Sequence, residues 1–148
     1  MPFEYKRIVV AIDGSEASEH AFEKAVEIAK RNDATLFVSH VVDTRAFATV
    51  EAYDRTLAER ADKYAAELLA RYERKAKEAG LQHIQVDIDY GSPKVKIAKE
   101  VAPKFEADLI ICGATGLNAV ERFFIGSVSE HITRYANCDV LVIRPDKE

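Results

Sequence analysis

Two short segments of small residues carry the clearest chemical signal in the sequence. Residues 113–116 read Gly-Ala-Thr-Gly directly after an apolar run, and residues 126–129 read Gly-Ser-Val-Ser before a helical pattern. A glycine after a buried strand lets a ligand approach the backbone, and the first amides of a helix have no partner within it. Together with the helix dipole and the serine hydroxyls, these amides predict an anion site suited to a phosphate. In a plainer interpretation the same residues only form tight turns and a helix cap.

Asp13 is the second candidate, because it ends the first apolar run and precedes Gly14-Ser15. An Asp at this place is also a good turn residue and helix cap, and both roles can coexist. A carboxylate that faces phosphates is repelled unless a divalent cation lies between them. Asp13 therefore makes Mg²⁺ a reasonable requirement and is the candidate metal ligand.

Other phosphate and catalytic motifs are absent from the sequence. No glycine is followed by lysine, which excludes a P-loop, and no Gly-x-Gly-x-x-Gly follows the first apolar run. No Gly-x-Ser-x-Gly elbow offers a seat for a hydrolase nucleophile. His40 stands near the end of the second apolar run, where a packed or solvated histidine is a more common finding than a catalytic one.

Alternating elements must position these residues. Five apolar or β-branched runs lie at residues 7–13, 35–42, 84–90, 108–112 and 139–143, and four helical patterns separate them. This order predicts an α/β fold, a single doubly wound, Rossmann-like domain over residues 1–148 with a five-stranded, mainly parallel sheet and helices on both faces. The third and fifth runs are expected at the sheet edges. The stretch 43–52 is expected to be an irregular connection.

The helical patterns carry their own start and stop signals. Ser15 or Ser18 can cap the first helix, and Pro93 suits the first position of the third. The second helix, about 53–79, has a stripe with Tyr64 and Tyr72 that faces the core or a partner. The stripe of the fourth helix consists of Val128, Ile132, Tyr135 and Ala136. Pro103 must kink or end the third helix early.

Composition limits the class of protein. With 148 residues the chain suits one domain, and a formal charge of −4 without a basic block argues against nucleic acid as a partner. The apolar run 8–12 is too short for a signal-peptide core or a membrane span. Cys112 and Cys138 are expected to be reduced thiols. We therefore expect a cytoplasmic protein that does not associate with membranes.

The spacing Gly113-x-x-Gly116-(nine residues)-Gly126-Ser127 resembles the nucleotide-binding signature of the universal stress protein family. The opening IVVAIDGS at 8–15, the Gly-Ser-Pro at 91–93 and the ending CDVLVIRP at 138–145 resemble that family too. The resemblance covers roughly residues 5–145 and implies the ATP-binding subgroup. One departure is that Ala114 and Thr115 stand where the family often has Ser-Arg or Ser-His. Arg122 is a candidate to replace the lost positive charge.

The resemblance implies a role for each matching residue. Ala11, Ile12 and Val41 would border the adenine, with backbone groups near Val41 reading its edge. Gly113 and Gly116 would approach the ribose and phosphates, and Asp13 would lie near these groups or their metal. The phosphate chain would be held by the start of the fourth helix: Gly126, Ser127, Val128 and Ser129.

Three functions remain open on this basis. The first is a nucleotide-responsive binding or regulatory module of the stress response, with ATP, AMP or a cyclic nucleotide as ligand, Mg²⁺ as its companion and protein partners of unknown identity. The second is a slow ATPase or an (auto)phosphotransferase. The third is a non-catalytic, chaperone-like dimer with a vestigial site. The apolar fifth run, Asp139–Ile143, predicts an edge strand that needs a cover, and the resemblance implies a homodimer through it.

Overall fold

All five predicted strands lie side by side in one parallel sheet. The structure is a computed structural model that describes residues 4–44, 55–115 and 125–144. The strand order is β3-β2-β1-β4-β5, and every neighbouring pair is parallel. The strands are β1 (Arg7–Ala11), β2 (Thr35–Asp43), β3 (Ile84–Gly91), β4 (Leu109–Gly113) and β5 (Asp139–Ile143). The predicted fold class is confirmed, with β3 and β5 at the two edges.

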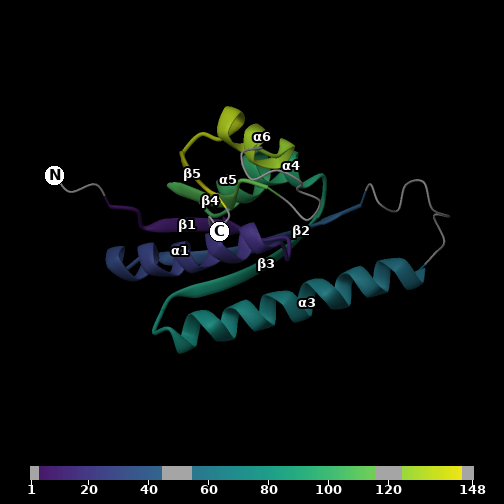
Figure 1. Cartoon of the computed structure of the whole chain (residues 1–148), viewed down its shortest axis with the longest axis horizontal. Coiled ribbons are helices and arrows are strands. Elements are labelled where there is room, and N and C mark those ends of the chain that lie inside the picture. Colours follow the sequence, from purple (N-terminus) through teal and green to yellow (C-terminus); the bar gives the residue numbers. More distant parts are fainter. Residues whose placement is uncertain (1–3, 45–54, 116–124, 145–148) are drawn as a thin grey trace.

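Helices cover both faces of the sheet (Figure 1). Side chains of Ile8 and Val10 pack under α1 (Glu16–Asn32) and α3 (Arg55–Glu78), whereas Val9 packs on the opposite face. That opposite face is covered by α4 (Pro93–Lys96), η1 (Ile97–Val101), α5 (Ala102–Lys104) and α6 (Ser127–Tyr135). From β1 the chain adds β2 and β3 on one side of the sheet, and it then crosses over to add β4 and β5 on the other side of β1. The winding reverses between β1 and β4, and ligands of such sheets bind beyond the carboxyl ends of the strands at this point.

The first strand is shorter than the sequence predicts. Residues 7–13 were expected to be extended, yet β1 ends at Ala11. The Ile12 N–H still donates to the Ser39 carbonyl at 2.9 Å, but the Asp13 N–H donates to the Ser18 hydroxyl at 3.3 Å. Ser15 caps α1, as predicted, because its Oγ accepts from the Ser18 N–H. The start of the helix thus withdraws the chain from the sheet at residue 13.

The tyrosines of the predicted helical stripes differ in burial. Tyr72 is in the core, whereas Tyr64 and Tyr135 are 47% and 48% exposed. Of the two alternatives for Tyr64, the core position is therefore wrong. Residues spaced by four drift around a long helix, because four residues exceed one turn of 3.6. Ala65 and Leu69 consequently fill the buried face of α3 beside Tyr72.

The third helical pattern contains a π turn directly before Pro103 and ends shortly after it. Ser92 precedes α4, and Pro93 takes its first position, as predicted. The Ala102 N–H then bonds to the Ile97 carbonyl, five residues back, which is the pattern of a π turn. The helix ends at Lys104, one residue after Pro103. Proline lacks an N–H and crowds the preceding turn, so the π turn directly before Pro103 has a direct cause.

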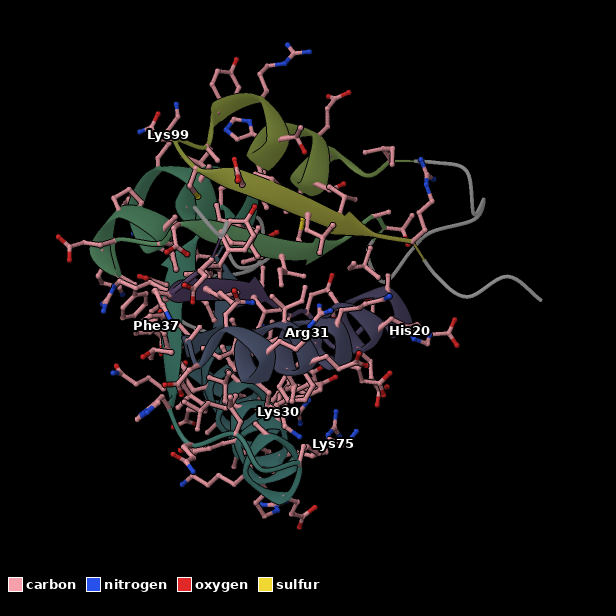
Figure 2. All side chains as sticks on the ribbon, turned by 90° about the vertical axis from the view of Figure 1, so that its left-hand side faces the viewer. His20, Lys30, Arg31, Phe37, Lys75 and Lys99 are labelled. Carbon is pink, nitrogen blue, oxygen red and sulfur yellow. The ribbon has the colours of Figure 1, made fainter. Side chains whose placement is uncertain are left out.

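The outer faces of the helices carry charged side chains (Figure 2). Lys30 and Lys75 lie on the α1–α3 side and Lys99 on the α6 side. The Lys75 ammonium pairs with Glu19 at 2.9 Å, which joins α3 to α1. Within the described ranges, no helix is long and apolar enough to cross a membrane.

Gly113 is the position at which added volume should damage this fold most directly. A Cβ at Gly113 would lie 2.8 Å from both the carbonyl carbon and the Cβ of Ala17. We expect Gly113→Ala to lower the free energy of unfolding by about 2 kcal/mol, because α1 would have to move away from β4. Urea unfolding followed by circular dichroism measures this change.

Gly126→Ala is the matched control. Its Cβ would lie 3.3 Å from the Ala114 carbonyl oxygen, and its φ of −68° suits any residue. Equal stability of the two variants would contradict the close packing of α1 on β4.

Candidate functional site

The predicted site residues gather at the carboxyl edge of the central strands. Ala11, Ile12 and Asp13 follow or end β1, Val41 lies near the end of β2, and Gly113 ends β4. Residues 126–129 form the start of α6, and the Gly126 N–H donates to the Ala114 carbonyl at 2.7 Å. Because β1 lies between β2 and β4, Asp13 stands between the Val41 side and the α6 side of this edge.

Asp13 shapes the turn that leads into α1. Its Oδ1 accepts a hydrogen bond from the Ser15 N–H at 2.9 Å, which is an Asx turn. Gly14, the residue between them, has a φ of +86° that favours glycine. The expected turn role of Asp13 is therefore confirmed, while Ser15 rather than Asp13 caps the helix. The carboxylate is partly exposed, so its other oxygen can still serve a ligand.

Val41 offers backbone groups at the edge of the sheet. Along β2, the Leu36 N–H donates to His83 on the β3 side, whereas the Ser39 carbonyl accepts from Ile12 on the β1 side. Backbone groups of alternate residues in a strand point the same way, so Val41, like Ser39, directs its N–H and carbonyl toward β1. In the part of the chain that the structure describes, β1 has already turned away and no backbone partner meets them. One donor and one acceptor at this spacing suit the edge of a planar base.

Two side chains that the sequence did not single out for the site lie beside these groups. His40 is buried, and its Nδ1 lies 2.8 Å from the Ile12 carbonyl oxygen. The hydroxyl of Tyr64, on α3, lies beside Gly14. The Tyr64 ring meets the His40 ring edge-on, with 6.1 Å between the ring centroids. The packed alternative for His40 is thus confirmed. The Asp13-Gly14-Ser15 sequence predicts the turn, but the periodicity of the second helix does not predict that Tyr64 lies beside it.

The Ala114 carbonyl fixes the start of α6. It accepts hydrogen bonds from the Gly126 N–H at 2.7 Å and from the Ser129 hydroxyl at 2.9 Å. The Ala114 N–H in turn donates to Ile143 of β5 at 2.7 Å. The first turn of α6 is therefore held against the end of β4, so its free amides are placed before any ligand arrives.

The first amides of α6 can serve as anion donors. Glu130 is the first residue of α6 whose N–H bonds within the helix, at 3.0 Å to the Gly126 carbonyl. The N–H groups of Ser127, Val128 and Ser129 precede it and have no backbone partner within the described ranges. The Ser129 hydroxyl is buried and donates its proton to Ala114, so Ser129 can offer a phosphate its amide but not that proton. The Ser127 side chain is exposed.

The turn after β4 is only partly described. Ala114 and Thr115 are buried and carry no charge, so neither replaces a cationic side chain at the site. Gly113 is required by its contact with α1, whether or not a ligand also approaches it. Gly116 and Arg122 lie outside the described residues, as does most of the expected irregular connection at 43–52.

Cys112 is close to this edge but is not a nucleophile. Burial raises the pKa of its thiol to about 12, so almost none of it is thiolate near neutral pH. It packs in the core on the α6 side of the sheet. Cys112 is thus a small buried residue of the core with a free thiol.

A divalent cation would have to share its ligands with a bound phosphate. In residues 4–44, 55–115 and 125–144, no three metal-binding side chains gather in one place. Asp13 supplies a carboxylate, and Mg²⁺ commonly takes one or two carboxylates together with substrate phosphates and water. Such a cation would fit the site only when a phosphate is present.

Known proteins share both the sequence and the fold. Residues 4–144 match the universal stress protein family. A protein of Staphylococcus saprophyticus named for this family is 48% identical over 143 residues, which span 97% of this chain and 86% of the relative. UspA from Lactobacillus plantarum has a TM-score of 0.86 at 34% identity and covers 97% of this chain and 100% of its own.

A further solved structure is of a universal stress protein in complex with cAMP. It has a TM-score of 0.73 at 26% identity, covering 97% of this chain and 100% of its own. The family match extends over nearly the whole chain and includes every strand of the sheet. This chain therefore belongs to the universal stress protein family.

Proposed function

We propose that this protein binds an adenine nucleotide, ATP with Mg²⁺ or AMP, and acts as a nucleotide-responsive binding or regulatory module in the stress response. The observation that carries the proposal is the alignment of three kinds of group along one edge. The Val41 backbone lies at the end of β2, Asp13 follows β1, and the α6 amides follow β4. A base, a metal-bridged phosphate and a phosphate chain need these groups in this order.

Each part of the nucleotide has a place in this proposal. The adenine lies on Ala11 and Ile12 and pairs its edge with Val41. The ribose passes Gly113 and Gly116, and the phosphates meet the start of α6, from Gly126 to Ser129. Asp13 would hold Mg²⁺ beside the phosphates, because the bare carboxylate would repel them. The cAMP complex of a relative supports an adenine ligand for this fold.

A slow ATPase or (auto)phosphotransferase would use the same site. Asp13 favours it, since a metal held there would polarise a phosphate. Hydrolysis of ATP above the rate of a metal-only control would support this second function. A chaperone-like dimer with a vestigial site is the third possibility, and an absence of nucleotide binding would favour it.

The nucleotide that accompanies the purified protein tests the site. The protein is purified without added nucleotide and denatured, and the supernatant is separated by ion exchange against adenine nucleotide standards. We expect stoichiometric ATP or AMP from the wild type. We expect none from Gly126→Val, whose methyl groups crowd the gap between Ala114 and the first turn of α6.

Thr133→Val is the matched control, because it adds a valine at an exposed position further along the same helix. The hydroxyl that it removes donates to the Ser129 carbonyl at 2.8 Å and leaves the amides of the first turn in place. It should retain the nucleotide of the wild type. An ADP peak would favour hydrolysis. A wild-type protein that is empty and also fails to bind added ATP with Mg²⁺ would contradict the proposed function.

We also propose a homodimer through β5. This strand is a sheet edge, and its Leu141 side chain is exposed. The Ile143 carbonyl accepts from Ala114, so by alternation Val140 and Val142 direct their backbone groups away from β4. An edge of this kind is usually covered or paired, and a second copy of the strand can pair with it.

Val142→Pro separates dimerisation from folding. It removes an N–H that points outward, so the circular dichroism spectrum should persist while sedimentation equilibrium shows a monomer. Leu141→Pro is the control, because it removes an N–H on the β4 side and should destabilise the fold itself. A folded Val142→Pro protein that remains dimeric would exclude this interface.

Charge and cysteine chemistry bear on where the protein acts. We propose a cytoplasmic location with protein partners and without nucleic acid or membrane partners. The formal net charge of −4 and the free thiols of Cys112 and Cys138 support this setting.

A further inference from the structure

The hydrogen-bond ladder between β1 and β2 ends one bond earlier than the positions of the two chains would allow. The Ile12 N–H donates to the Ser39 carbonyl at 2.9 Å, which is a regular parallel bond. In a parallel ladder the next bond would run from the Val41 N–H to the Ile12 carbonyl. That bond is absent from the described part of the chain, although both residues are buried and lie on neighbouring segments.

The His40 side chain takes the place of the missing bond. Its Nδ1 lies 2.8 Å from the Ile12 carbonyl oxygen. A carbonyl oxygen only accepts, so Nδ1 carries the proton and donates. The carbonyl that would have accepted from the Val41 N–H therefore accepts from the residue next to Val41 instead.

The imidazole is held in this position by its surroundings. His40 is 8% exposed, and the Tyr64 ring packs edge-on against it at 6.1 Å. The Tyr64 hydroxyl also contacts Gly14, two residues after Ile12. The ring is thus confined between α3 and the turn that follows β1.

We propose that His40 is a positioning residue that ends the β1–β2 ladder early and thereby keeps the Val41 N–H available for the edge of a bound base. This inference rests on the proposed function for the identity of the ligand. The juxtaposition of Nδ1 with the Ile12 carbonyl stands without it. If His40 only filled space in the core, its replacement would not change whether the Val41 N–H bonds to the Ile12 carbonyl.

The first test uses nuclear magnetic resonance on the protein without ligand. In the wild type, the Val41 amide should exchange with solvent faster than the Val38 amide inside β2. It should show no coupling across a hydrogen bond to the Ile12 carbonyl. In His40→Leu the donor is lost, so the coupling should appear and exchange at Val41 should slow. A wild-type Val41 amide that already shows this coupling would overturn the proposal, whatever the variants do.

His40→Asn is the matched variant, because its side-chain N–H₂ can reach the place of Nδ1 while the ring is lost. It should leave a cavity beside Tyr64 and lower stability as His40→Leu does, yet keep the Val41 amide free. A purely structural role predicts that both variants behave alike at Val41. That outcome would also overturn the proposal.

Binding supplies the second test. His40→Leu should bind ATP with Mg²⁺ about tenfold more weakly than the wild type, the cost of about one backbone hydrogen bond. Tripolyphosphate with Mg²⁺ has no base, so its affinity should not change, and His40→Asn should keep most of the affinity for ATP. Equal ATP affinity in His40→Leu and the wild type would overturn the proposal. A wild type that binds no adenine nucleotide would defeat the proposed function, and the resonance experiment would then decide the role of His40 alone.

Discussion

Parallel pairing between β1 and β2 ends at the bond from Ile12 to Ser39, and the layout of the candidate site depends on this end. Past it, Asp13 turns into α1 through its bond to the Ser15 amide, while β2 continues to Asp43. The continuing strand presents backbone groups on a side that has lost its neighbour. A backbone N–H and carbonyl without partners cost free energy when they are shielded from water. A polar, planar ligand can supply both partners at this edge.

A second constraint acts on the other side of β1. The Ala114 carbonyl accepts from both Gly126 and Ser129, and the Ala114 amide donates to β5. One residue therefore joins the end of β4, the start of α6 and the end of β5. The amides of α6 are fixed relative to the sheet, so they can favour an anion without reorganising when it binds.

The sequence predicted the sheet and its edges well, because alternation of apolar runs with helical stripes is a strong signal over whole segments. Single positions were harder. Gly113 was predicted to make room for a ligand, and the structure shows that α1 already requires the glycine. The Ser129 hydroxyl was expected to face a phosphate, but it donates to Ala114. The residue type shows which hydrogen bonds a side chain can make, but the neighbours in the folded structure determine which of these bonds form. His40 and Tyr64 show the same limit, since their contacts join residues far apart in the sequence.

Backbone amide shifts during a titration with ATP and Mg²⁺ test the central claim most directly. We predict that the largest changes fall on Val41 and on Ser127, Val128 and Ser129, on both sides of Asp13. Saturation should coincide at all of these amides, because one ligand spans them. Shifts confined to another surface, such as the cleft lined by Thr133, Arg134 and Arg144 between α6 and β5, would contradict the account.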